Sequence, residues 1–193
     1  MSKDSFKGKV VIITAPSGAG KTTIVKHLKE VFSQLAFSIS ATTRLKRKDE
    51  VHGKDYFFTT SDEFNELIAN GDLVEWQEVY ENQFYGTLRS EVDRIWDDQK
   101  HILFDIDVKG ATNLKSKFQF DALSIFIKPP SLSTLMERLI NRRSESPDDL
   151  KRRIRKMKEE LSYESEFDLS VINDDLEVAL EHTEQLVREF LSN

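Results

Sequence analysis

The sequence predicts an α/β domain in which helices flank a mostly parallel β-sheet. The first observation is a series of short, continuous apolar runs, which are typical of strands buried on both faces of a parallel sheet. The second is that helical patterns separate these runs, as crossover connections between parallel strands require. The third is the composition, because 38% of the 193 residues are hydrophobic, enough for a core, while 32% are charged.

The first 55 residues contain the clearest strand and helix of this pattern. Residues 9–14 form a β-branched run, and apolar residues at helical spacing follow at positions 24, 25, 28 and 31. Residues 37–40 predict a short second strand. The segment 42–55 is polar and basic, and we expect a loop there.

The next forty residues have a different texture, with shorter elements. Ser61 is a suitable N-cap for a helix, and Gly71 is a suitable residue to end it. The predicted elements are strands at 56–59 and 73–79 and helices at 61–70 and 88–96.

The buried-strand pattern returns in the second half of the chain. Pro129 and Pro130 end one of these strands, and Pro147 suits the first turn of a long helix. We expect strands at 101–107, 122–128 and 168–172 and helices at 131–142, 147–163 and 176–191.

We therefore expect one domain over residues 1–193, with two insertions in its core. The core comprises residues 1–40, 98–130 and 166–193, and the insertions are residues 41–97 and 131–165.

Composition and charge exclude several classes of protein. Cysteine is absent, which excludes a disulfide scaffold, a thiolate nucleophile and a cysteine-based metal site. No apolar run approaches the roughly 18 residues of a transmembrane helix, and the N-terminus lacks the apolar stretch of a secretory signal. The net charge of −6 gives no global attraction to nucleic acid or to an anionic membrane. We expect a soluble, cytoplasmic protein with neither of these partners.

A phosphate-binding loop follows the first strand. Residues 15–22 (APSGAGKT) fit the (A/G)-x-x-x-x-G-K-(S/T) P-loop pattern between a buried strand and a helix, with Ala15 where Gly is more usual. Backbone N–H groups and the positive end of the helix would hold a triphosphate, and Gly18 and Gly20 permit the backbone to approach it. Lys21 would reach the β- and γ-phosphates, and the Thr22 hydroxyl would ligate Mg²⁺.

A carboxylate at the end of a second buried strand completes this predicted site. Asp105 ends an apolar strand where P-loop proteins keep the acid that associates with Mg²⁺, which we expect it to contact through water. A strand-end cap is the alternative role for Asp105.

The first insertion indicates what the second substrate carries. Arg44, Arg47 and Tyr56 lie in one polar segment, and guanidinium groups match phosphate oxygens two at a time. The segment therefore predicts a site for a phosphorylated acceptor.

Over essentially its whole length, the chain resembles the guanylate kinases. The departures from the family pattern are small, such as Ala41 and Thr87 in place of Ser, and Lys46 where Pro is frequent. The motifs that carry the resemblance are residues 15–22, 38–44, 53–58, 73–76, 85–87, 103–107, 126–131 and 172–176.

The resemblance implies roles for residues of the first insertion and the core. The role of Glu75 in recognising guanine also has a physical basis. One carboxylate accepts hydrogen bonds from both adjacent donors of guanine, whereas adenine presents an acceptor at that position. Such a site rejects the wrong base by about 10⁴-fold. The residues implied to hold the 5′-phosphate of GMP are Arg44, Arg47, Tyr56 and Tyr85. Those implied to surround the guanine are Ser40, Glu75, Thr87 and Asp107.

The resemblance also assigns the donor side of the site. Residues 131–165 would be a lid whose Arg138, Arg142 and Arg153 face the phosphates of ATP, although a charged helix is often only a solvated face. Asn173 would lie beside the adenine. The residues implied to bind ATP are Ala15, Pro16, Ser17, Gly18, Ala19, Gly20, Lys21, Thr22, Thr23 and Asn173.

The implied reaction is ATP + GMP ⇌ ADP + GDP by direct in-line transfer, with Mg²⁺ as cofactor and dGMP as a second acceptor. The attacking phosphate has a second pKa of about 6 and needs no general base. Catalysis would rest on positioning and on charge neutralisation by Lys21, Mg²⁺ and the lid arginines. Asp105 would take part as the acid that associates with Mg²⁺.

Two other functions stay open at this stage. One is a non-catalytic guanylate-kinase-like module that binds phosphopeptides, and the other is a P-loop kinase for another acceptor such as a ribose bisphosphate. The sequence also leaves open whether the protein is a monomer or a homodimer.

Overall fold

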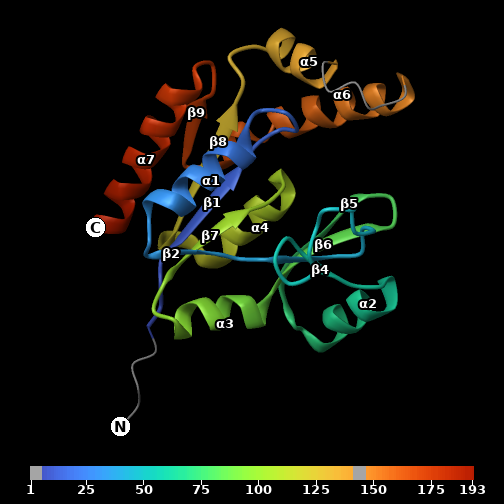
Figure 1. The fold of residues 1–193 in the computed structure, drawn as a ribbon, viewed down its shortest axis with the longest axis vertical. Helices are drawn as coiled ribbons and strands as arrows, with labels where there is room; N and C mark the ends of the chain where they lie inside the picture. The colour runs from blue at the N-terminus through green and yellow to red at the C-terminus, as the bar shows by residue number, and fades with distance from the viewer. Residues whose placement is uncertain (1–5, 141–146) are drawn as a thin grey trace.

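The computed structural model describes residues 6–140 and 147–193, with the side chains of residues 137–140 and 147–153 outside the description. Its largest sheet has five parallel strands with β1 at the centre (Figure 1). The strands, in spatial order, are β2 (Leu35–Phe37), β7 (His101–Asp105), β1 (Val10–Thr14), β8 (Ala122–Lys128) and β9 (Leu169–Ile172). Because Ile13 pairs with Asp105, the loop after β1 begins beside the carboxyl end of β7.

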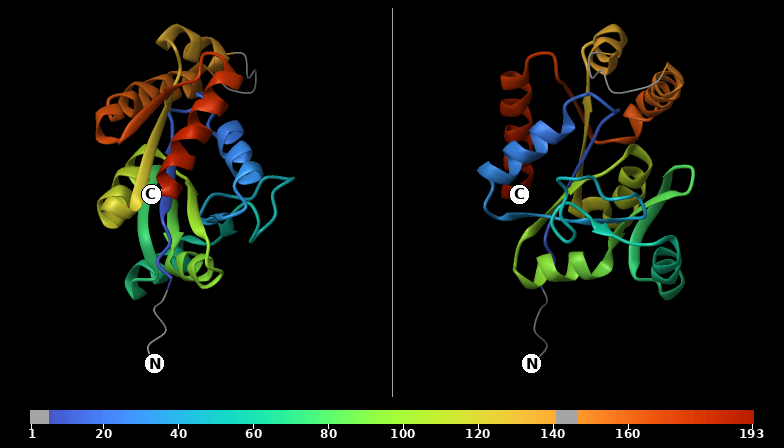
Figure 2. Two further views of the ribbon diagram at one scale, coloured as in Figure 1. Left: turned by 90° about the vertical axis from the view of Figure 1, so that its left-hand side faces the viewer. Right: turned by 45° about the vertical axis from the view of Figure 1, so that its right-hand side comes forward.

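Helices cover both faces of this sheet (Figure 2). All five residues of β1 are buried: Val11 and Ile13 face one side, and Val10 and Ile12 face the other. The first side packs against α1 (Lys21–Val31) and α7 (Leu176–Ser192), and the second packs against α3 (Arg89–Asp97) and α4 (Val108–Phe118).

A second, four-stranded sheet lies beside the first, at the lower right of Figure 1. Its strands, in spatial order, are β4 (Phe57–Phe58), β3 (Ser40–Thr42), β6 (Gln83–Leu88) and β5 (Leu73–Tyr80). Helix α2 (Ser61–Asn70) packs Phe64 against this sheet in a small core of its own. Thr87 of β6 pairs with Ser40 on one side and with Glu75 on the other, so three polar residues meet across the sheet.

Two helices, α5 (Leu132–Ile140) and α6 (Pro147–Leu161), extend across the top of the molecule in Figure 1. Leu135 of α5 and Met157 of α6 are fully buried in the core that includes α1. Short 3₁₀ helices, η1 (Gln119–Asp121) and η2 (Glu164–Glu166), precede β8 and β9. Among the residues that the structure describes, none of the helices has the length and apolarity needed to cross a bilayer.

The predicted fold class is confirmed, and the structure differs from the local predictions at four places. The single strand expected at 37–40 is two strands, because the chain leaves the large sheet after Phe37 and enters the small one at Ser40. Strand β6 was not predicted, and its Tyr85–Thr87 motif lies within it. Thr60, not Ser61, caps α2, because its side chain and that of Glu63 form a reciprocal capping box.

The fourth difference concerns the segment after β7. The strand predicted at 101–107 ends at Asp105, and the unpredicted helix α4 begins at Val108. Asp107 is its N-cap, with Oδ1 accepting from the N–H groups of Lys109 at 3.0 Å and Gly110 at 3.3 Å. A cap of this kind satisfies donors that the first helical turn leaves unpaired.

Candidate active site

The P-loop connects β1 to α1 in the way that its pattern predicts. Gly18 and Gly20 have φ angles of 92° and 95°, in the left-handed region that glycine adopts without strain. Gly20 is the N-cap of α1, and the N–H of Ala19 donates to the carbonyl of Pro16 at 3.1 Å. The positive end of α1 therefore faces a tight loop, an arrangement that favours anions.

Asn173 supports the P-loop from the end of β9. It is 4% exposed, and its Nδ2 donates to the carbonyl of Ala19 at 2.8 Å. A Cβ added to Gly20 would overlap with the same Nδ2 atom, so glycine is required there by packing as well as by its backbone angle. The structure thus places Asn173 under the loop, where it restrains the backbone that would hold phosphate.

Lys21 and Asp105 form an ion pair at the adjoining ends of α1 and β7. The ammonium group of Lys21 also donates to the carbonyl of Ile106 at 3.2 Å. Thr22 and Asp105 line the same cleft. Hard oxygen donors of these two kinds fit Mg²⁺, which proteins usually bind through one or two carboxylates together with substrate phosphates.

The cleft has a volume of about 350 Å³ and lies between the P-loop and the second sheet. It brings together predicted residues from distant parts of the sequence. Those that line it are Ala15, Ser17, Lys21, Thr22, Ser40, Arg47, Tyr56, Glu75, Tyr85, Asp105 and Asp107. Among the residues whose side chains are described, the predicted ones outside this lining are Pro16, Gly18, Ala19, Gly20, Thr23, Arg44, Thr87 and Asn173. Arg44 and Thr87 donate to two lining residues, Tyr85 and Glu75.

Glu75 is the most unusual carboxylate of the cleft, because only 5% of the residue is exposed. Burial raises its pKa to about 7, against the opposing effect of a hydrogen bond from Thr87. The Thr87 hydroxyl donates to Oε1 at 3.0 Å, and a Cβ added to Gly110 of α4 would lie 3.0 Å from Oε2. The Thr87 hydroxyl therefore positions one oxygen, and the missing side chain of Gly110 leaves space for the other.

Arg44 forms an ion pair that the sequence did not reveal. Its Nη2 and Nη1 atoms donate to the two oxygens of Glu50 at 2.8 and 3.0 Å, and its Nε donates to the Tyr85 hydroxyl at 3.2 Å. The hydrogen bond with Glu50 raises the pKa of Arg44 and lowers that of Glu50. The guanidinium also lies 5.2 Å from the centre of the Tyr56 ring, close enough for a cation–π interaction.

The tyrosines connect Arg44 to the cleft. Tyr56 and Tyr85 line the cleft and meet edge to face, with 6.0 Å between their ring centres. Burial raises the pKa of Tyr56 to about 12, so it is a hydrogen-bond donor at neutral pH. Arg47 is largely exposed and extends into the same cleft.

The lid arginines cannot be placed by the structure. Arg142 lies outside the described residues, and the side chains of Arg138 and Arg153 in α5 and α6 are likewise outside the description. Two residues near the end of α6, Lys156 and Glu160, line the cleft although nothing in the sequence singled them out. Their charged stretch is typical of a solvated helix face.

Known proteins similar to this chain match nearly all of it. The guanylate kinase family model matches residues 7–190. A guanylate kinase from Salinibacter ruber is 48% identical over 184 residues, which cover 95% of this chain and 97% of that protein. One from Bacteroides fragilis is 45% identical over 185 residues, covering 96% of this chain and 91% of that protein.

A solved structure agrees with the sequence comparisons. The crystal structure of guanylate kinase from Anaplasma phagocytophilum superposes with a TM-score of 0.78 at 28% identity, covering 96% of this chain and 87% of that one. These matches do not favour a phosphopeptide-binding module or a kinase for another acceptor. The chain belongs to the guanylate kinase family, and its activity is the ATP-dependent phosphorylation of GMP.

Proposed function

We propose that the cleft between the P-loop and the second sheet is the place where the phosphoryl group passes from ATP to GMP. In this proposal residues 41–97 form the GMP-binding subdomain and residues 131–165 form the lid of a single domain. The observation that carries it is that Lys21, at the start of α1, and Glu75, in β5 of the second sheet, line the same cleft. Donor and acceptor would therefore meet end to end.

Glu75 is proposed to recognise the guanine. Its ionised carboxylate accepts from guanine N1–H and N2–H₂, while Thr87 holds one oxygen in place. Ser40 and Asp107 line the neighbouring wall. A buried acceptor of this kind rejects a base that lacks these two donors, because the carboxylate is then left unpaired.

The 5′-phosphate of GMP is proposed to bind Arg47, Tyr56 and Tyr85, with Arg44 completing the site. Arg44 reaches the Tyr85 hydroxyl through Nε and stacks near Tyr56. Its bidentate pair with Glu50 keeps the guanidinium in one orientation. The two tyrosines would thus be held in position to donate to phosphate oxygens.

The donor is proposed to be ATP with Mg²⁺. Thr22 and Asp105 would hold the metal, which when bound neutralises charge on the phosphates and orients them. The backbone from Ala15 to Thr23, restrained by Asn173, would hold the triphosphate. Lys21 would exchange part of its contact with Asp105 for the β- and γ-phosphates, and the lid arginines Arg138, Arg142 and Arg153 would approach from the other side.

Transfer would be direct and in line, without a general base. The phosphate of GMP is largely ionised at neutral pH, since its second pKa is about 6. The protein's own contribution is then to align two anions that repel each other and to exclude water as a competing acceptor. Lys21 and the arginines supply the positive charge for this.

A coupled assay of ADP release tests the proposal. Purified protein would be supplied with ATP and Mg²⁺ and with GMP, dGMP, AMP, CMP, UMP or ribose phosphates in turn. We expect release with GMP and dGMP only, and loss of release when EDTA removes the metal. Equal release with AMP would contradict the proposed role of Glu75. The cytoplasmic location remains a prediction.

A further inference from the structure

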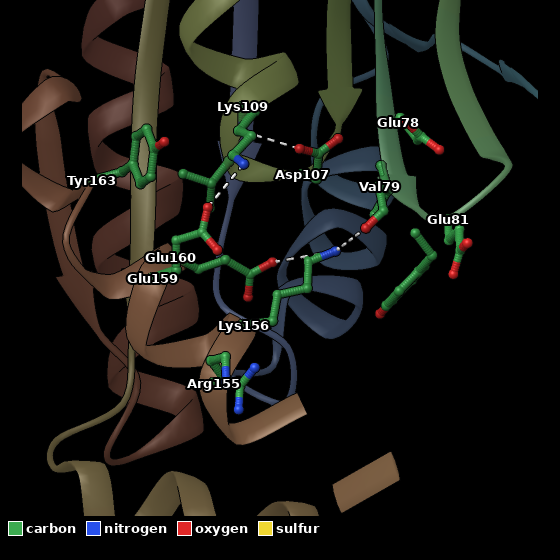
Figure 3. A pocket seen from close by; sticks show the side chains of 12 residues that line it. Glu78, Val79, Glu81, Asp107, Lys109, Arg155, Lys156, Glu159, Glu160 and Tyr163 are labelled. Atoms are coloured by element: carbon green, nitrogen blue, oxygen red, sulfur yellow. Dashed lines mark hydrogen bonds and ion pairs between the residues drawn. The ribbon is translucent and has the colours of Figure 1, made fainter. Parts of the chain in front are cut away.

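Lys156, near the end of α6, contacts the strand that carries Glu75. Its Nζ donates to the carbonyl of Val79 at 3.1 Å and lies 4.0 Å from the centre of the Tyr80 ring, a cation–π distance. Val79 and Tyr80 are the last residues of β5. Figure 3 shows a pocket beside α6 that Lys156 and Val79 both line, and in it the side chain of Lys156 extends from the α6 ribbon to Val79. Lys156 is mostly buried, and burial lowers its pKa.

Glu160, one helical turn further along α6, contacts the P-loop. Its Oε2 accepts from the backbone N–H of Ser17 at 3.2 Å, and its Oε1 lies 3.9 Å from the Nζ of Lys156. Glu160 is 9% exposed, and burial raises its pKa. A spacing of four residues places the two side chains on one face of the helix.

These contacts form one continuous connection between the two halves of the cleft. It runs from the P-loop at Ser17 through Glu160 and Lys156 to the end of β5. The two side chains also lie between the active-site cleft and a second cavity of about 330 Å³, because both of them line each cavity. The wall that both cavities share consists of Val79, Tyr80, Asp107, Lys156 and Glu160.

A neighbouring ion pair provides a comparison on the same helix. Glu159 pairs with Lys109 of α4 at 2.8 Å, but both side chains are about half exposed. Exposed pairs of this kind contribute little, because water and salt screen them. The connection through Lys156 and Glu160 is buried and ends on backbone groups of the two substrate-binding segments, so it can fix their relative position.

We propose that Lys156 and Glu160 are positioning residues that act as one unit and hold the P-loop and the GMP-binding sheet in register for phosphoryl transfer. This inference rests on the proposed donor and acceptor sites. Neither residue has to touch the transferred group. A displacement of about 1 Å between donor and acceptor is enough to slow transfer by about 10²-fold, which gives such a connection its importance.

The test is a double-mutant cycle with Lys156→Met, Glu160→Gln and the double variant. Each single change should lower kcat at least about tenfold, while the Kd of GMP alone and of an ATP analogue alone, by calorimetry, change less than about threefold. The double variant should be no slower than the slower single variant, because the second change breaks a connection already lost. Lys156→Arg, which keeps the charge and a donor, should restore most of the kcat.

Glu159→Gln and Lys158→Met are the matched controls, since both residues lie on the exposed side of the same helix. They should leave kcat within about twofold of the unchanged protein. Thermal unfolding checks the fold of every variant, and Lys156→Gln replaces Lys156→Met if the latter shows no cooperative transition. Effects that multiply in the double variant, or unchanged kcat in both single variants, would overturn the inference. Failure of the unchanged protein to phosphorylate GMP would instead overturn the proposed site.

Discussion

The hydroxyl of Thr87 donates to Oε1 of Glu75 at 3.0 Å, across neighbouring strands of the second sheet. This bond fixes the carboxylate in a place where burial raises its pKa to about 7. At neutral pH the free protein therefore contains both the protonated and the ionised form of Glu75. Only the ionised form accepts two hydrogen bonds from guanine, so ligand binding and proton release are linked.

The first prediction follows from this pKa. Binding of GMP should weaken about tenfold for each pH unit below 7 and level off above it, because the protonated Glu75 presents a donor to guanine donors. The phosphate of GMP also titrates, at about 6, so affinity alone does not separate the two groups. The ¹³C chemical shift of the Glu75 carboxyl separates them. It should show a titration near pH 7 in the free protein, and in the complex it should keep the value of an ionised carboxylate.

The second prediction concerns recognition of the base. Glu75→Gln should raise the KM for GMP about 10²-fold or more, because its amide places an N–H against guanine donors. The KM for ATP should change little. Glu66→Gln, on the exposed side of α2, is the matched control. Unchanged GMP kinetics in the Glu75 variant would show that guanine is recognised elsewhere.

Gly110 gives a third prediction. An added Cβ would lie 2.6 Å from Cδ1 of Ile106 and 3.0 Å from Oε2 of Glu75, so Gly110→Ala should displace both the Ile106 side chain and the carboxylate that Thr87 holds. We expect about a tenfold rise in the KM for GMP with the KM for ATP unchanged, although alanine is the better helix former by about 1 kcal/mol. Steady-state kinetics with Ser116→Ala, an exposed site on α4, provide the comparison.

Lys21 is the subject of the fourth prediction. Lys21→Met should lower kcat/KM at least about 10²-fold, since it removes the charge that the P-loop brings to the moving phosphoryl group. Circular dichroism should show an intact fold. Lys26→Met, an exposed residue of α1, should have near-normal activity. Near-normal turnover in the Lys21 variant would defeat the assignment of the P-loop.

The fifth prediction separates two roles for Asn173. Asn173→Asp places a carboxylate oxygen against the Ala19 carbonyl, where Nδ2 now donates at 2.8 Å. The loop should distort, and the KM for the phosphoryl donor should rise about tenfold. The rise should be the same whether ATP or GTP is the donor. A direct contact with adenine would instead change the ratio between the two donors. The Kd of GMP measured alone should not move.

The sequence predicted those elements of the fold whose pattern lies within a short stretch of the chain. The strand at 10–14 and the loop after it were predicted, because a buried β-branched run and left-handed glycines are encoded within a dozen residues. Helix α4 was missed because Ile106 extends the apolar pattern of β7 beyond Asp105, although Asp107 is a good cap. The change of sheet after Phe37 has no local signature, since both strands are short and extended.

The site residues divide in the same way. Glu75, Tyr85 and the P-loop belong to patterns whose residue types suit a nucleotide, and the structure brings them to one cleft. The roles of three other residues depend on partners elsewhere in the chain. Glu50 pairs with Arg44, Lys156 with Val79 and Glu160 with Ser17, and these partners are 6, 77 and 143 residues away. Charged residues in a loop or on a helix are usually solvated, so only the folded arrangement distinguishes these three.

The central place of β1 has a consequence for synthesis on the ribosome. This strand emerges first, yet both of its neighbours, β7 and β8, come from residues 101–128. The apolar residues 10–14 of the nascent chain therefore have no neighbouring strand to pair with until more than half of the polypeptide has been translated, and they are prone to aggregate during this time. Nucleotide cannot help this early segment to fold, so a chaperone that shields residues 10–14 should raise the yield of active protein more than added ATP analogue does.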